Sequence, residues 1–332
     1  MSVIKYSFGI LLGVLLLWLA FRNIELEAAI NQIQKANFLW VAFSLSIALF
    51  SHFVRAVRWR MLLQPVGYLP NTYNTFAAVV IGYMANNAVP RLGEISRCSL
   101  LTRSDKIPFT VAIGTVVLER LMDMLIMMVF LGIAFFLEYE KILLIIDQMT
   151  QGQSSAQLEN RWIFFGVILI LCLIMVGLII KFYAQLLQIP LFRKIVDFLI
   201  PLFKSFTSIT RVKYPWLFCF LTLLIWFCYI AQFYIAFKAL EETQHLSFYF
   251  GFMMMIIGSL GVIVPVPGGV GAFHYLTLVG FMAFGYSETA AISYALLVHA
   301  ANYLIILLAG IICYITLIIK PSRDAAIKPI NL

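Results

Sequence analysis

The residues best suited to chemistry in this sequence interrupt otherwise apolar segments. Residues 81–97 read Ile-Gly-Tyr-Met-Ala-Asn-Asn-Ala-Val-Pro-Arg-Leu-Gly-Glu-Ile-Ser-Arg, which mixes amides, a proline, a glycine and three charges. Its candidate substrate-binding residues are Asn87, Arg91, Glu94 and Arg97. Irregular backbone at membrane depth is tolerated only where it is buried in protein or lines a wet cavity. We therefore expect this stretch to build a site rather than an ordinary membrane-spanning helix.

A second interrupted segment lies at residues 256–274. Its prolines stop a helix, and its glycines permit positive φ and close backbone approach. The candidate site residues here are Pro267, Gly268, Gly269, Gly271 and His274. A new helix starting at this point could hold a phosphate on its amide groups, and a plain tight turn is an equal alternative. Paired Gly/Pro-broken segments indicate a transporter site, here with the two elements entering from opposite faces of the membrane.

Three ionisable residues, Glu119, Arg120 and Asp123, stand at the centre of the apolar run 109–137. The run would be about 43 Å long as a helix at ~1.5 Å per residue. On the scale of membrane-insertion free energies, three central charges disfavour insertion by roughly 8–10 kcal/mol. The sixteen Leu, Ile, Phe and Val residues favour it by roughly 5–10 kcal/mol. The helix therefore needs partners, either Arg120 with Asp123 or charges from another element. A substrate pathway and a structural ion pair are both open, and they are compatible.

Three arginines end the second apolar run. Arg58 is a candidate site residue, and Arg55 lies one turn before it on the same face. For Arg55 and Arg60 a role in setting topology is the favoured interpretation.

The histidines are weaker candidates for functional residues. His299 and Asn302 share a helix face, where a hydrogen bond between helices is favoured over a proton relay. We interpret His52 and His245 as ordinary interfacial residues.

The elements that must carry these residues are membrane helices. The chain has 332 residues, of which 63% are hydrophobic and 11% charged, and a mean hydropathy of +0.99. This composition predicts one all-α polytopic integral membrane domain over residues 1–332, with about six full spans and two broken elements, either re-entrant or paired short spans. Residues 182–213 are expected to be an amphipathic cytoplasmic segment, or a connecting loop. The expected spans are 6–21, 38–54, 109–137, 162–180, 215–237 and 289–319.

Positive charges give the expected orientation. If each broken element returns to its own side, seventeen of the 23 Lys and Arg residues lie on the side of the N-terminus and five on the other. This bias predicts cytoplasmic N- and C-termini. The expected location is a bacterial inner membrane. The net charge of +8 is then a matter of topology and anionic lipid, with no nucleic-acid partner. The five cysteines have no metal-ligand spacing, so we expect no metal, cofactor or disulfide.

Four motifs together resemble one family, the flippase-like transmembrane region of lysylphosphatidylglycerol synthases. They are Arg55-x-x-Arg58-Trp59, Asn87-Ala-Val-Pro90-Arg91-Leu92-Gly93-Glu94-x-x-Arg97, Glu119-Arg120-x-x-Asp123 and Pro267-Gly268-Gly269-Val270-Gly271. The family often has an acidic residue after the last glycine, where this chain has Ala272. The resemblance implies translocation of an anionic or aminoacylated phospholipid, or of another lipid-linked substrate. Because the sequence ends at Leu332 without the aminoacyl-transferase domain of bifunctional members, we expect no synthesis of lysyl-lipid.

On these grounds membrane lipids are the expected partners, and the arginines Arg91, Arg97 and Arg120 the expected phosphate contacts. Glu94, Glu119 and Asp123 are expected to orient those arginines or to meet a cationic head group. Two alternatives are an enzyme acting on a polyprenyl-linked sugar, with Glu119 or Asp123 as base, and an accessory subunit. A glycosyltransferase or an aminoacyl-transferase would be the protein partner.

Overall fold

The computed structural model describes residues 2–22, 26–138, 212–264 and 266–319, and every regular element within these ranges is a helix. Four helices are long and apolar enough to cross a membrane. They are α3 (Phe38–Leu63, continued by the short 3-10 helix η1, Gln64–Val66), α6 (Phe109–Leu137), α11 (Pro215–Phe237) and α14 (Glu288–Ile319). The predicted all-helical membrane class is thereby confirmed.

The predicted spans agree closely with these helices. The ranges 109–137 and 215–237 are those of α6 and α11, and 38–54 lies within α3. The range 6–21 lies within α1 (Ser2–Phe21), which is followed by the short polar helix α2 (Leu26–Gln34). The expected span 162–180 and almost all of the segment 182–213 lie outside the described residues.

The two interrupted segments form helical hairpins. The first consists of α4 (Thr72–Ala88) and α5 (Leu92–Asp105), and the second of α12 (Phe248–Ile263), the 3-10 helix η3 (Pro267–Gly269) and α13 (Ala272–Ala283). The longest arm has 17 residues, or about 26 Å at ~1.5 Å per residue. Because a bilayer core is ~30 Å thick, an arm of this length reaches into the membrane without crossing it when upright.

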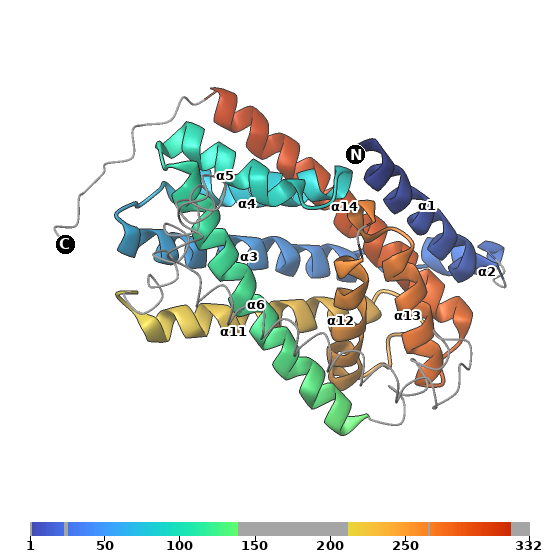
Figure 1. Cartoon of the computed structure of the whole chain (residues 1–332). Helices are drawn as coiled ribbons and strands as arrows, with labels where there is room; N and C mark the ends of the chain where they lie inside the picture. The colour runs from blue at the N-terminus through green and yellow to red at the C-terminus, as the bar shows by residue number, and fades with distance from the viewer. Residues whose placement is uncertain (1, 23–25, 139–211, 265, 320–332) are drawn as a thin grey trace, which may run out of the picture.

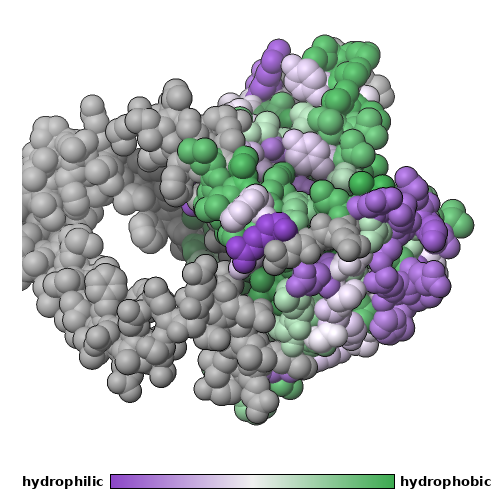
Figure 2. All heavy atoms as spheres, turned by 90° about the vertical axis from the view of Figure 1, so that its right-hand side faces the viewer, coloured by the Kyte–Doolittle hydropathy of each residue, from purple (hydrophilic) through white to green (hydrophobic). Residues whose placement is uncertain are grey.

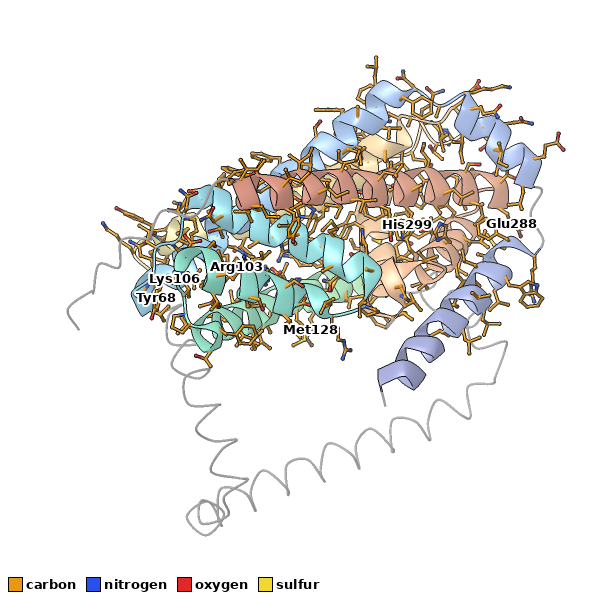
Figure 3. The ribbon with its side chains drawn as sticks, turned by 90° about the horizontal axis from the view of Figure 1, so that it is seen from above. Tyr68, Arg103, Lys106, Met128, Glu288 and His299 are labelled. Atoms are coloured by element: carbon orange, nitrogen blue, oxygen red, sulfur yellow. The ribbon has the colours of Figure 1, made fainter. Side chains whose placement is uncertain are left out.

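The hairpins start from opposite ends of the long helices. Tyr68 and Lys106, which flank the first hairpin, lie together at one end of the molecule, and Glu288, which follows the second hairpin, lies at the other (Figure 3). Asp105 closes the base of the first hairpin by accepting hydrogen bonds from the Asn71 backbone at 2.9 Å and the Asn74 amide at 3.0 Å. Each hairpin therefore returns to the end from which it came, which is the inverted arrangement expected from the sequence.

Glycines let the arms of both hairpins pack closely. A Cβ on Gly93 of α5 would lie 2.6 Å from the Asn86 side chain and against the Gly82 carbonyl of α4. In the second hairpin a Cβ on Gly261 would come within 3.0 Å of the Phe273 backbone. A side chain at Gly93 or Gly261 would therefore push the two arms apart.

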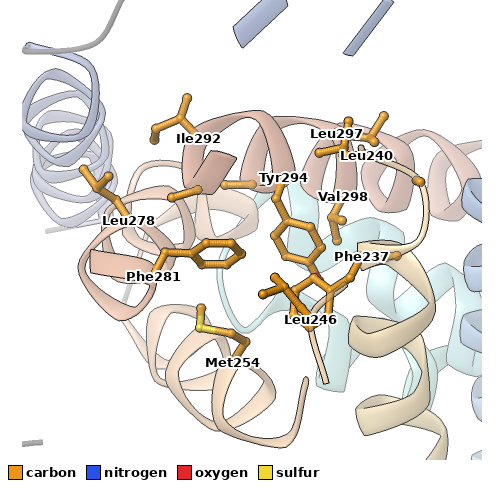
Figure 4. Packing of buried hydrophobic residues seen from close by; sticks show 14 of the residues in the cluster. Phe237, Leu240, Leu246, Met254, Leu278, Phe281, Ile292, Tyr294, Leu297 and Val298 are labelled. Carbon is orange, nitrogen blue, oxygen red and sulfur yellow. The ribbon is translucent and has the colours of Figure 1, made fainter. Parts of the chain in front are cut away.

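A cluster of buried aromatic residues holds the second hairpin against α11 and α14 (Figure 4). The Phe237 ring of α11 lies 4.8 Å from Tyr294 of α14 and 5.4 Å from Phe250 of α12, and Phe281 of α13 lies 5.0 Å from Phe250. Aromatic pairs at these distances add to the free energy of burial. Phe250 and Phe281 lie near the outer ends of α12 and α13, so this cluster fixes the base of the hairpin. His299 of α14 lies farther along that helix (Figures 1 and 3).

The outer faces of the long helices are apolar and exposed. On α6 they include Met124, Leu125, Met128 and Val129, all more than half exposed. Seen from the end that carries α2 and the start of α14, the molecule shows hydrophilic atoms gathered beside hydrophobic ones (Figure 2). Apolar flanks and a polar end are what a protein surrounded by lipid requires.

Candidate functional site

A cavity of about 500 Å³ opens where the two hairpin tips meet. Gly268 of η3 lies against the Asn87 backbone of α4, so each tip forms part of the same wall. The helices α3, α6, α11 and α14 complete the lining. This volume lies within the range of roughly 300–1,000 Å³ that is typical of small-molecule sites.

The charged residues that line the cavity are Arg91, Glu94 and Arg120. Arg120 of α6 forms a salt bridge with Glu94 of α5 at 3.1 Å, with side chains 39% and 27% exposed. Arg91 is exposed at the first tip and has no ion-pair partner among the described residues. Its backbone is left-handed, with φ of 66°, a conformation costly for a residue with a Cβ. The cavity wall therefore carries a net positive charge.

A second set of charges lies behind this wall and does not line the cavity. Arg55 of α3 contacts Glu119 at 2.5 Å and Asp123 at 2.8 Å, and donates to the Tyr229 hydroxyl at 2.7 Å. Arg58 binds Asp123 at 2.9 Å. All these side chains are at most 13% exposed in the ion pairs. We call Arg55, Arg58, Arg97, Glu119 and Asp123 the ion cluster.

Arg97 joins the ion cluster from α5. Its guanidinium contacts Glu119 at 3.3 Å and lies over the Trp59 ring, 4.7 Å from the ring centre. Trp59 in turn donates to the Thr115 hydroxyl at 2.9 Å. Two Arg97 nitrogens, Nε and one Nη, are buried without a hydrogen-bond partner in the described part of the chain. Glu119 is thus shared by three arginines, which fasten α3, α5 and α6 together.

The opposite part of the wall is polar but uncharged. Gln232 of α11 donates to the Asn302 side chain of α14 at 2.7 Å, and Asn302 donates to the Val298 carbonyl at 2.9 Å. His299 bonds the Gly268 carbonyl at 2.9 Å, which ties α14 to the second tip. These are the hydrogen bonds between elements that the sequence favoured over a proton relay.

The second loop is divided between the cavity and α1. Gly268 and Gly269 line the cavity, whereas Pro267, Gly271 and His274 do not. A Cβ on Gly271 would meet the Gly13 carbonyl of α1, and the Phe21 ring of α1 lies 6.1 Å from the His274 ring. The glycine there permits a close crossing with α1, so the tight-turn alternative describes this loop better than a phosphate cradle.

The sequence matches one known family of membrane proteins. Residues 6–310 match the family described as Lysylphosphatidylglycerol synthase TM region. The chain belongs to this family. The match covers α1 to α13 and most of α14, so both hairpins and the cavity are features of a family member.

A curated relative of this family member is the UPF0104 membrane protein of Methanocaldococcus jannaschii, an archaeon. It is 26% identical over 132 residues, which are 39% of each chain. The matching segment thus spans about two fifths of the length of that relative. No solved structure matches the chain.

Within this family member, the predicted site residues fall into three groups. Asn87, Arg91, Glu94, Arg120, Gly268 and Gly269 line the cavity. Arg58, Arg97, Glu119 and Asp123 form the buried ion cluster, and Pro267, Gly271 and His274 face α1 or the loop itself. Arg97, the third expected phosphate contact, is 2% exposed and lies behind the cavity wall in this structure.

Other sequence interpretations also need correction. Arg55, taken as a topology determinant, is 2% exposed and binds two carboxylates. His52, taken as interfacial, lines the cavity with its ring 4.3 Å from Tyr83. Arg120 and Asp123 do not pair with each other, because partners from other helices reach both. The charge count had placed the three buried arginines Arg55, Arg58 and Arg97 on the cytoplasmic side, and without them fourteen residues remain against five.

Sequence reasoning missed several lining residues. Gln232 is the clearest example, since it is the one amide within the apolar run Pro215–Phe237, and a polar residue in such a run is itself a signal of function. Tyr83 and Asn86 lie in the stretch 81–97 but were not selected. Ser51, Tyr229 and Ser259 carry no comparable signal in the sequence.

The arrangement is better suited to binding than to acid–base chemistry. Glu119 and Asp123, the candidate bases, are each bound by arginines and do not reach the cavity. A carboxylate stabilised by two cations is a weak proton acceptor. The described residues contain no group of three metal-ligating side chains.

Proposed function

We propose that this protein moves an anionic lipid between the leaflets of the cell membrane, with the lipid head group passing through the cavity between the hairpin tips. The observation that carries the proposal is the net positive cavity wall at the meeting point of two hairpins from opposite ends of the molecule. Half-crossing elements that meet at mid-depth give a site that can be reached alternately from either side.

In this proposal Arg91 and Arg120 bind the phosphate of the head group. Arg91 has no carboxylate partner among the described residues, and Arg120 has only the partly exposed Glu94. A phosphate would neutralise both arginines with charge-assisted hydrogen bonds. The acyl chains would remain in the bilayer beside the apolar outer faces of the helices.

The proposed location is the bacterial inner membrane, with the base of the first hairpin on the cytoplasmic side. The charges that remain after the interior arginines are set aside still favour this side.

The test is transport of an acyl-labelled fluorescent phosphatidylglycerol in proteoliposomes. Arg120→Gln and Arg91→Gly should each slow transport about tenfold or more, because each removes a charge-assisted contact with the phosphate. Arg91→Gly should also raise the free energy of unfolding by up to about 1 kcal/mol, since glycine adopts positive φ without strain.

Two matched variants control for the loss of a surface charge and for the loss of backbone strain at a residue with positive φ. Arg103→Gln removes an exposed arginine of α5 outside the cavity. Lys106→Gly replaces the other non-glycine residue with positive φ among the described residues. Both should transport at the rate of the natural protein. Equal rates for Arg91→Gly and Lys106→Gly would remove Arg91 from the mechanism.

A further inference from the structure

The charged residues of the cavity wall are confined to a few elements, whereas neutral polar residues come from both hairpins and from the long helices. The charged residues come from the first tip, α5 and α6. The helices α11 and α14 instead contribute an amide pair, an imidazole and a phenol, namely Gln232, Asn302, His299 and Tyr303. A bound molecule that satisfied both parts of the wall would be charged at one end and neutral but hydrogen-bonding at the other.

The neutral part of the wall has groups left to bind a ligand. The hydroxyl group of Tyr303 on α14 has no hydrogen bond within the described part of the chain, and neither has that of Tyr83, which lies on α4 of the first hairpin. His52 is 8% exposed, and its Nδ1 atom is buried without a partner among the described residues. Gln232 uses its NH₂ group for Asn302, which leaves the amide oxygen as an acceptor. Amides, phenols and imidazoles together match hydroxyl groups, which both donate and accept.

The same wall is poorly equipped for an amine. Glu94 is the one carboxylate among the lining residues, and it belongs to the charged part of the wall. Arg120 binds its Oε1 atom, and its Oε2 atom is buried without a hydrogen-bond partner among the described residues. Glu119 and Asp123 lie behind the wall, bound by arginines. An ammonium group at the neutral end would therefore be desolvated without a carboxylate partner, beside a wall of net positive charge.

We infer that the cavity selects a lipid head group in which a phosphate is joined to a neutral, hydroxyl-rich part, such as a polyol or a sugar, and discriminates against an aminoacylated head group. This inference rests on the proposed function and adds the substrate class of the same site. Gln232 and Tyr303 are the specificity-determining residues, and Arg91 and Arg120 bind the phosphate common to all anionic phospholipids.

The experiment compares three fluorescent lipids in proteoliposomes of the full chain: phosphatidylinositol, phosphatidic acid and lysyl-phosphatidylglycerol. The natural protein should move phosphatidylinositol about tenfold faster than either of the others, because a site built for hydroxyl groups rejects ligands that leave its polar groups unpaired. Gln232→Leu and Tyr303→Phe should lower the ratio of phosphatidylinositol to phosphatidic acid toward one. The rate for phosphatidic acid in the same preparation shows that the variant is folded.

Tyr314→Phe is the matched control, since Tyr314 is an exposed tyrosine of the same helix outside the cavity. It should leave the lipid ratio unchanged. Equal transport of lysyl-phosphatidylglycerol and phosphatidylinositol, or a ratio unaffected by Gln232→Leu, would overturn the inference while leaving translocation intact.

Binding of the same lipids, measured by native mass spectrometry, separates the two claims. Preferential binding of phosphatidylinositol that depends on Gln232, without transport, would support the substrate class and overturn translocation. Absence of both preference and transport would overturn both.

Discussion

At the scale of single residues, the decisive feature is how the charges are divided. Three arginines share Glu119 in the ion cluster, whereas Arg91 and Arg120 face the cavity. A buried ion pair contributes little net stability compared with apolar packing, but loss of one partner leaves a buried charge uncompensated. The ion cluster is therefore expected to determine stability and the cavity arginines to determine binding.

Asp123→Ala should destabilise the protein by roughly 3–5 kcal/mol, because Arg55 and Arg58 would lose a buried partner. Glu94→Gln should cost less than about 1 kcal/mol, since the Glu94 and Arg120 side chains are partly exposed. Thermal unfolding of the two purified variants measures the difference. Similar melting temperatures for both would contradict this division.

At the scale of elements, the two hairpins depend on close helix contacts. Each has short arms, and each has a glycine where the arms cross. The tips are fixed by different means: the first by the side chain of Asn86, which accepts from the Gly93 backbone at 2.7 Å, and the second by His299 on the Gly268 carbonyl. The position of the tips, and with it the cavity, follows from these contacts.

Gly93→Ala should destabilise the protein by roughly 1–3 kcal/mol, because its Cβ would clash with the backbone of α4. Gly132→Ala in α6 is the control, since nothing lies within 4 Å of the added Cβ. It should stabilise the helix by about 0.5–1 kcal/mol. In thermal unfolding, Gly93→Ala should lower the melting temperature and Gly132→Ala should raise it. A higher melting temperature for Gly93→Ala would show that the arms are not in close contact.

At the scale of the whole molecule, the hairpins give the protein an inverted arrangement about its middle. The base of the first hairpin and the start of α14 lie at opposite ends (Figure 3). A membrane perpendicular to the long helices would place these ends on opposite sides. The apolar outer faces of α6 and α14 then meet lipid along most of their length.

Single cysteines at Lys106 and Glu241 test this arrangement in a background without the five native cysteines. A membrane-impermeant maleimide should label Lys106→Cys from the cytoplasmic side and Glu241→Cys from the other side, because the two positions flank opposite ends of the long helices. Ser46→Cys in the interior of α3 is the control and should resist labelling from both sides. Labelling of both terminal positions from one side would contradict the inverted arrangement.

Local sequence patterns were enough to predict the membrane class, most bounds of the long helices and the two interrupted segments. These follow from local properties: hydropathy over about twenty residues, and the effects of proline and glycine on backbone conformation. The sequence also selected six of the residues that line the cavity, because charges and amides in apolar segments stand out without any knowledge of packing.

Which charges pair and which face the cavity depends on contacts between helices that are distant in the sequence. Helical periodicity relates residues within one helix, so it offered Asp123 as one possible partner of Arg120 but could not name the partners on other helices. Arg55 and Glu119 are 64 residues apart, and any arginine attracts any carboxylate, so their pairing depends on how α3, α5 and α6 pack. The same packing buries Arg97 against Glu119 and places Gln232 in the cavity wall. The contacts of a helix with its neighbours decide which of its faces is buried and which lines the cavity.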